Sequence, residues 1–370
     1  MKILQLVTKR QFRGAELSAF HLSAKLIECG HEIVWVGVYP LVNDTLDLPG
    51  AFQEDLPGNK KSFFNLKKAL ALKKIIITQG VDVIQANGAE TIKYAVAASL
   101  LGAPKPIVYR NISQVGFWLK GATVRKMFSR FLLSKAKQII SVGDASKKDM
   151  ISTFPAFENK TIVINRGVPV KPLNKTEASS NLKARYGLSA DTKVLLWAGA
   201  FSKEKNIGML LEIMKQPNLA NAPVVLIMAG RGVLFEEIKD IVEEEFNGKI
   251  ILVGYQKNLE IFYAGADLFL LTSHIEGVPG VILEAAVQHT PSVSVNVGGV
   301  DEVIIQRQTG IIVNEYDAKI FSKEVIDLLA NAELCMDMGN KAFALVKDKF
   351  DEEKNTRKFV EVYQKLMQKK

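Results

Sequence analysis

Short apolar runs alternate along the chain with longer stretches of helical period. The predicted strands of the first half are Lys2–Val7, Glu32–Gly37, Val83–Gln85, Ile107–Tyr109, Gln138–Val142 and Ile162–Ile164. Those of the second half are Lys193–Ala198, Val224–Ala229, Ile250–Val253, Leu268–Leu271 and Ser292–Val295. Because strands that alternate with helices form parallel sheets covered on both faces, the two series predict an α/β protein with two doubly wound domains.

A polar segment separates the two series of strands. Residues 169–192 contain two prolines and clustered Ser, Thr and Asn, which predicts a linker between a first domain, 1–168, and a second domain, 193–350. In the tail, residues 351–370, apolar residues recur at helical spacing. We therefore expect a C-terminal helix that packs back on the first domain.

Composition places the chain among globular proteins. A length of 370 residues suits two domains, and 48% hydrophobic with 24% charged residues is typical of a folded chain. Apolar runs are shorter than the ~18 residues that a membrane helix needs, and we expect no secretory signal. Cys29 and Cys335 have no Cys or His close by in the sequence, which argues against disulfide and zinc frameworks. We therefore expect a cytoplasmic protein.

The net charge of +9 is distributed unevenly. Residues 1–180 hold 26 basic and 13 acidic residues, whereas residues 181–370 hold 22 and 26. Residues 91–143 contain nine Lys or Arg and no acid. This polarity indicates an anionic partner such as a membrane surface, a nucleic acid or an acidic substrate, with a merely solubilising surface as the alternative.

Two segments combine apolar residues at helical spacing with basic residues, namely 116–137 and 63–77. Such helices are typical of proteins that lie on anionic membrane surfaces. Ordinary helices that cover a sheet and carry solvated lysines are the alternative interpretation. The acid-free run favours the inner face of the cytoplasmic membrane, and nucleic acid is disfavoured because no recognised binding motif accompanies the charge.

The strongest chemical pattern lies in residues 271–286, LTSHIEGVPGVILEAA. A strand ends near Leu271 and a helix is expected to start around Gly280, with Glu276 on the loop and Glu284 within the helix. Amide groups at a helix N-terminus bind phosphate, and carboxylates bind sugar hydroxyls. The pattern therefore suits a nucleoside diphosphate with hydroxyl-rich groups at both ends. The alternative is that Glu276 is solvated on its loop and Glu284 caps its own helix.

This segment resembles the Glu-x7-Glu motif of glycosyltransferase family 4, whose members are retaining, use nucleotide sugars and have the GT-B fold. Further segments resemble that family in order and spacing, and they cover nearly the whole chain: RGAE (13–16), GHEIVWV (30–36), SVGDASKKDM (141–150), INRGV (164–168), AGAFSKEKN (198–206), VGYQKN (253–258) and VGGVDEVI (297–304). The resemblance implies two Rossmann-like domains that face each other across a cleft.

The resemblance also implies roles for individual residues. Glu284 would bind the ribose hydroxyls of the donor, and Glu276 would hold hydroxyls of the transferred sugar. Lys205 would neutralise the charge of the leaving phosphate, so that Glu276 and Lys205 are the expected catalytic residues. The remaining donor contacts would be the backbone of Gly14 in the first loop and the amides of Gly280, Val281 and Ile282.

Three departures from the family pattern stand out. An arginine common in the family is Ala200 here. The glycine pair of the first loop is Arg13–Gly14 here, and we expect Arg13 to supply the lost charge. Many members have a His after the strand at 107–109, where this chain has Arg110 and Asn111, which we expect on the acceptor side.

The loops after two strands of the second domain are expected to flank the nucleoside. The residues expected there are Gly230, Arg231, Gly254 and Tyr255. AGRGVLFEE (229–237) is a partial match to a dinucleotide-binding loop, in which Phe235 replaces the third glycine. The chain has no Asp-x-Asp pair of the kind that binds a metal in another transferase fold, so we expect no metal and no organic cofactor.

The sequence thus predicts a glycosyltransferase that moves a sugar from a UDP-sugar or GDP-sugar to a glycan or lipid-linked acceptor. The expected setting is cell-envelope polysaccharide or glycolipid synthesis. Two alternatives stay open: an epimerase or phosphorylase on the same fold, and a non-catalytic subunit that binds nucleotide sugars.

Overall fold

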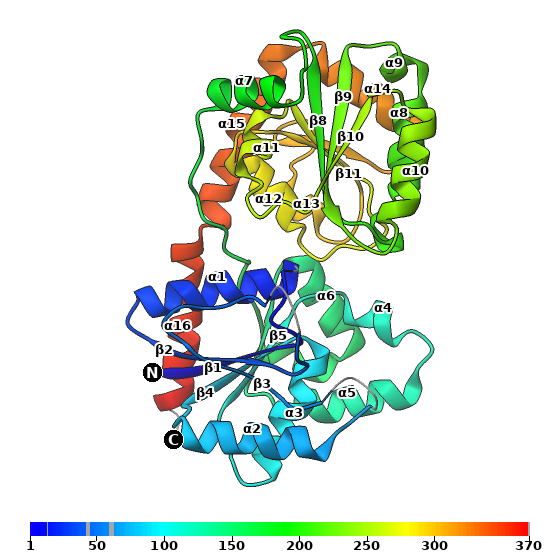
Figure 1. Ribbon diagram of the computed structural model, residues 1–370. Helices are drawn as coiled ribbons and strands as arrows, with labels where there is room; N and C mark the ends of the chain where they lie inside the picture. Colours follow the sequence, from blue (N-terminus) through cyan, green and yellow to red (C-terminus); the bar gives the residue numbers. More distant parts are fainter. Residues whose placement is uncertain (13, 42–44, 59–62, 369–370) are drawn as a thin grey trace. The chain divides into compact units, whose positions relative to one another are not determined.

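The computed structural model describes residues 1–12, 14–41, 45–58 and 63–368 (Figure 1). It consists of two compact units, each built around one parallel sheet. The first unit combines Met1–Val168 with Phe350–Lys370, and the second is Pro169–Lys349. The predicted α/β class with two parallel-sheet domains is confirmed.

The first unit has a parallel sheet of order β3-β2-β1-β4-β5-β6-β7. Its strands are β1 (Lys2–Val7), β2 (Glu32–Gly37), β3 (Phe52–Asp55), β4 (Val83–Asn87), β5 (Ile107–Asn111), β6 (Gln138–Ser141) and β7 (Thr161–Val163). The chain starts in the middle of the sheet, adds β2 and β3 on one side of β1, and then adds β4 to β7 on the other side. This topology leaves a switch point where the loops after β1 and β4 diverge.

Helices cover both faces of this sheet. They are α1 (Gly14–Glu28), α2 (Leu66–Thr78), α3 (Ala89–Leu100), α4 (Val115–Leu119), α5 (Thr123–Lys135), α6 (Asp144–Thr153), the 3₁₀ turn η1 (Pro155–Lys160) and α16 (Glu352–Gln368). Alternate strand residues face opposite sides. Leu4 and Leu6 therefore pack with α2, α3 and α5, whereas Ile3 and Val7 pack with α1 and α16 (Figure 1).

The second unit has a parallel sheet of order β10-β9-β8-β11-β12-β13. Its strands are β8 (Lys193–Ala200), β9 (Val224–Arg231), β10 (Ile250–Gly254), β11 (Leu268–Leu271), β12 (Ser292–Val295) and β13 (Gly310–Val313). The helices are α7 (Lys175–Arg185), η2 (Lys203–Lys205), α8 (Ile207–Lys215), α9 (Pro217–Ala220), α10 (Phe235–Glu245), α11 (Glu260–Gly265), α12 (Gly280–Val287), α13 (Val300–Val303), α14 (Ala318–Leu329) and α15 (Ala332–Lys349).

The expected linker at 169–192 is wrong, because this segment contains α7 and belongs to the second unit. Asn174 caps the helix by accepting a hydrogen bond from the Glu177 amide at 3.1 Å. Ala178 and Leu182 are buried against α11, where a Cβ on Gly265 would lie 2.8 Å from Leu182 Cδ2. The polar composition of this segment reflects the exposed face of a packed helix.

The basic segment 116–137 also differs from expectation, since it forms two helices, α4 and α5, instead of one. Gly121 lies between them with φ +73°, a backbone conformation that residues other than glycine rarely adopt. In the part of the chain that the structure describes, none of the helices has the length and hydropathy to cross a bilayer.

Candidate functional site

Two loops at the carboxyl edge of the second sheet are tied to each other. One follows β8 and contains η2, and the other follows β11. The buried Thr272 hydroxyl lies 3.2 Å from the Lys205 and Asn206 carbonyl oxygens and donates to them, and the His274 amide donates to the Glu204 carbonyl at 2.8 Å. These bonds fix the backbones of the two loops that carry Lys205 and Glu276.

Lys205 and Glu276, the two expected catalytic residues, form an ion pair. Lys205 Nζ donates to Glu276 Oε1 at 2.7 Å. The side chains are 24% and 11% exposed, so the pair is partly shielded and still reaches solvent. A charge-assisted bond of this length holds both groups in a defined place. The alternative in which Glu276 is simply solvated on its loop does not describe this arrangement.

The turn after β12 supports the Glu276 backbone from the other side. Gly298 has φ +59°, and a Cβ there would lie 2.1 Å from the Glu276 carbonyl oxygen. The Gly299 amide donates to the Gly277 carbonyl at 2.7 Å. Because only glycine permits both this conformation and this approach, the VGGV segment positions the carboxylate-bearing loop.

Helix α12 begins at Gly280, directly after that loop, with Pro279 as its N-cap residue. The first turn of any helix leaves its amide groups without intrahelical acceptors. In α12 these are the amides of Gly280, Val281 and Ile282, which follow Glu276 along the chain. This end of α12 also carries the partial positive charge of the helix dipole, which favours a bound phosphate.

Glu284 lies one turn into α12 and is half-buried. The Tyr263 hydroxyl, from α11, donates to Glu284 Oε2 at 3.0 Å. Tyr263 is itself buried, and its carbonyl oxygen accepts a hydrogen bond from the Thr290 hydroxyl at 2.6 Å. Glu284 is thus oriented by a residue of the neighbouring helix. Sequence reasoning missed Tyr263, because no motif marks a tyrosine 21 positions before its partner.

The residues expected to flank the nucleoside meet at the ends of β9 and β10. The Arg231 guanidinium carbon lies 4.6 Å from the centroid of the Tyr255 ring. Gly254 has φ +66°. A side chain at position 230 would not fit, since a Cβ there would lie 1.8 Å from the Gly199 carbonyl oxygen of the neighbouring strand. Arg231 and Tyr255 together form a flat cationic and aromatic surface.

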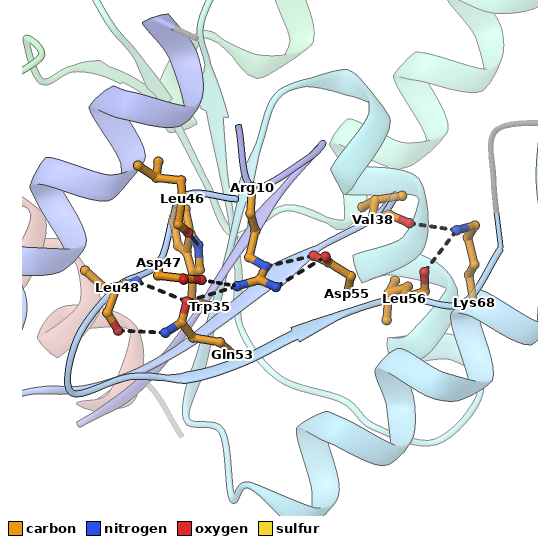
Figure 2. A network of polar contacts seen from close by, with 10 residues as sticks. All are labelled: Arg10, Trp35, Val38, Leu46, Asp47, Leu48, Gln53, Asp55, Leu56 and Lys68. Atoms are coloured by element: carbon orange, nitrogen blue, oxygen red, sulfur yellow. Dashed lines mark hydrogen bonds and ion pairs between the residues drawn. The ribbon is translucent and has the colours of Figure 1, made fainter. Parts of the chain in front are cut away.

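In the first unit, the loop after β1 is fixed to the sheet edge by Arg10 (Figure 2). The Arg10 Nε donates to Asp55 Oδ1 at 2.9 Å, and its Nη1 donates to Gln53 Oε1 at 3.0 Å. Both partners lie on β3, a strand that the sequence analysis missed. Gly14, the first residue of α1, is exposed with open space around its Cα. Arg13 lies outside the described residues.

The expectation that Arg110 and Asn111 lie on a loop after the strand is wrong. They are the last two residues of β5, and both side chains are buried. Arg110 Nη2 donates to the Ser18 hydroxyl at 2.7 Å, and Asn111 Nδ2 donates to the Ser146 carbonyl at 3.1 Å. Burial, assisted by the nearby Arg166 charge, lowers the pKa of Arg110 to about 10. These contacts hold β5 to its helices.

Among the described residues, we find no group of three or more His, Cys, Asp or Glu side chains that could hold a metal ion.

Comparison with known proteins identifies the family. The model of glycosyltransferase family 4 matches residues 12–171, and the model of glycosyl transferases group 1 matches residues 179–345. N-acetyl-alpha-D-glucosaminyl L-malate synthase of Bacillus anthracis is 28% identical over 95% of this chain and 93% of that protein.

Two further matches agree with the family. The Escherichia coli UDP-Gal:alpha-D-GlcNAc-diphosphoundecaprenol alpha-1,3-galactosyltransferase is 24% identical over 72% of this chain and 69% of that protein. The structure of Anabaena HepE in complex with UDP-glucose superposes with a TM-score of 0.83, at 18% identity, and covers 99% of this chain and 100% of HepE. The two parallel sheets, the loops at their edges and these matches agree. The chain belongs to glycosyltransferase family 4 and has the GT-B fold.

Proposed function

We propose that this glycosyltransferase moves a sugar from a nucleoside diphosphate donor, a UDP-sugar or GDP-sugar, to a glycan or lipid-linked acceptor with retention of anomeric configuration. The observation that carries the proposal is the Lys205–Glu276 ion pair, placed directly before the N-terminus of α12 and supported by two neighbouring loops. UDP is the first donor nucleotide to test, since HepE was crystallised with UDP-glucose.

Each group at this edge has a part in the proposed reaction. Lys205 and the amides of Gly280, Val281 and Ile282 stabilise the negative charge that develops on the departing diphosphate, which is the usual source of rate enhancement in such a step. Glu276 accepts hydrogen bonds from hydroxyls of the transferred sugar, and Glu284, held by Tyr263, accepts them from the ribose.

Neither a metal ion nor an organic cofactor is required by the proposed reaction, because the lysine and the amides supply the positive charge. Arg231 and Tyr255 are proposed to lie against the nucleoside, beside Gly230 and Gly254. Gly14 and Arg13 are proposed as donor contacts on the family resemblance alone.

We propose that the acceptor belongs to cell-envelope polysaccharide or glycolipid synthesis and that the enzyme works in the cytoplasm on the inner face of its membrane. The name of the Escherichia coli relative specifies a diphosphoundecaprenol-linked acceptor, which supports a lipid-linked one here. The name of the Bacillus anthracis relative specifies L-malate, so a small soluble acceptor is the alternative to test beside it.

The experiment begins with thermal unfolding in the presence of UDP-, GDP- and ADP-sugars. A ligand at 100 times its Kd stabilises the folded state by about 2.7 kcal/mol, which is readily measured. The stabilising donor is then incubated with a diphosphoundecaprenol-linked sugar or with malate, and the anomeric proton of the product is assigned by NMR. Donor binding without transfer to any glycan, lipid-linked or small acceptor would indicate a binding subunit, and a product with inverted configuration would refute retention.

A further inference from the structure

Helix α5 exposes apolar side chains that a helix covering a sheet normally buries. Val124 and Met127 are 81% and 69% exposed, and Phe131, one turn further on, is exposed as well. Their spacing places them on one side of the helix. Leu132 and Leu133, near the end of the helix, are buried and pack into the core of the first unit. The exposed stripe is therefore additional to the face that holds α5 in place.

Helix α2 repeats this arrangement on the same layer of the first unit. Leu66, Leu70 and Ile77 are exposed, while Leu72 and Ile76 are buried against the sheet. Phe63, just before α2, is exposed and packs its ring edge-on against Phe128 of α5 at a centroid distance of 5.2 Å. Phe63 thus connects the start of α2 with α5, and α3 lies between the two helices (Figure 1).

Basic residues flank both stripes. Arg125, Lys126, Arg130 and Lys135 are exposed on α5, and Lys67 and Lys74 are exposed on α2. Residues 91–143 contain no acid, and neither do residues 56–81. The exposed apolar side chains therefore lie on segments that carry basic residues and no acidic ones. Exposed apolar stripes with basic flanks are typical of helices that rest at the interface of an anionic bilayer.

A groove next to the α5 stripe adds room for a headgroup. It has a volume of about 540 Å³ and lies at the connection between α4 and α5, with Lys120 and Lys126 among its lining residues. Trp118 on α4 is exposed close by in the chain, and tryptophan is enriched at membrane interfaces. The neighbouring Asp149 carboxylate accepts a hydrogen bond from the Gly116 amide at 2.9 Å, so it is already engaged.

We propose that the α2–α5 surface of the first unit, defined by the exposed stripes of these two helices and their basic flanks, docks on an anionic lipid bilayer. The apolar side chains enter the interfacial region, and the lysines and arginines contact lipid phosphates. An acidic protein partner would also match the charge, but the apolar stripes lie on convex helices rather than in a groove. This proposal rests on the membrane setting given under the proposed function and names the surface that would produce it; none of its residues is among the proposed donor contacts.

The test is co-sedimentation of the full chain with vesicles of phosphatidylglycerol in phosphatidylcholine, and with vesicles of phosphatidylcholine alone, over a range of salt concentrations. We expect binding to the anionic vesicles that weakens as salt rises, because the charges are screened. The combined variant Arg125→Gln, Lys126→Gln and Arg130→Gln should lower the partition coefficient by about 100-fold, the factor that three cations near an anionic leaflet contribute together.

A second variant, Val124→Ser, Met127→Ser and Phe131→Ser, should lower partitioning by about tenfold or more at constant charge. Matched controls lie on α14 and α15 of the second unit: Lys319→Gln with Lys323→Gln and Lys341→Gln for charge, and Ile320→Ser with Met336→Ser for exposed apolar area. The controls should bind as the unaltered chain does. All variants should keep its thermal stability and its stabilisation by UDP, which reports the second unit separately.

Equal binding to neutral and anionic vesicles, or no binding at low salt, would overturn the proposal. So would unchanged partitioning of both α5 variants, because the surface would then not be the one that meets the lipid.

Discussion

Lys205, the proposed phosphate-binding lysine, is paired with the Glu276 carboxylate at 2.7 Å. A diphosphate that recruits Lys205 must compete with the Glu276 carboxylate and must approach a second negative charge. We therefore predict that Glu276→Gln binds UDP more tightly than the unaltered enzyme, although it transfers sugar more slowly. Glutamine keeps the size of the side chain and removes its charge.

The magnitude follows from the exposure of the pair. With side chains 24% and 11% exposed, the pair is at the upper end of surface ion pairs, about 1 kcal/mol. If UDP binding breaks this pair, its removal should improve the affinity for UDP by roughly fivefold. Transfer should fall by about 100-fold, because the charged partner of the sugar hydroxyls is lost at the reacting centre.

Isothermal calorimetry with UDP measures the first effect, and the transfer rate at saturating donor and acceptor measures the second. Glu315→Gln is a matched control, since Glu315 is an exposed carboxylate just beyond β13, at the same edge of the sheet. It should change neither quantity. If Glu276→Gln bound UDP tenfold more weakly, or if Glu315→Gln gained as much affinity, competition between carboxylate and phosphate for Lys205 would be refuted.

Three further predictions concern the same edge of the second sheet. Lys205→Ala should lower the transfer rate at saturating substrates by about 100-fold, and a rate within threefold of the unaltered enzyme would exclude Lys205 from charge stabilisation. Glu284→Ala should weaken UDP binding by about 1–3 kcal/mol in calorimetry and Tyr263→Phe by about 1 kcal/mol; equal affinity of Glu284→Ala would remove Glu284 from the site. Gly298→Ala should lower the unfolding free energy by about 1–3 kcal/mol and also slow transfer, whereas Gly248→Ala, which has φ +80° but no atom within 4 Å of its Cβ, should show only the smaller cost of the conformation.

Much of the fold could be predicted because most strands are buried on both faces and read as apolar runs. Two strands were missed, β3 and β13, and β3 lacks this signal. β3 reads FQED and lies at the sheet edge with alternate residues exposed, so burial on one side leaves no apolar run. β13 reads GIIV, follows the polar segment QRQT and is only four residues long. Both missed strands lie at a sheet edge, and a short apolar run next to polar residues is not by itself assigned to a strand by its period.

Arg110 and Asn111 were expected on a loop, but both end a strand and are buried. Arg110 and Asn111 look like loop residues, because charged and amide side chains seldom lie inside a sheet. In the structure Ser18 and Ser146 satisfy part of their hydrogen-bonding capacity from α1 and α6, far away in the sequence. Whether a polar side chain at a strand end is solvated or buried depends on partners that the local sequence does not contain.

The same dependence on distant partners decides the state of the site. The types of residue at the edge could be predicted, since a carboxylate, a lysine and a helix start each have a sequence signal. Their pairing could not, because Lys205 and Glu276 are 71 positions apart and meet only when β8 and β11 lie side by side in the sheet. Without the structure, Lys205 is a free cation that attracts a diphosphate. With it, Lys205 is paired with a carboxylate, and this pairing is the reason why Glu276→Gln is predicted to bind UDP more tightly and not more weakly.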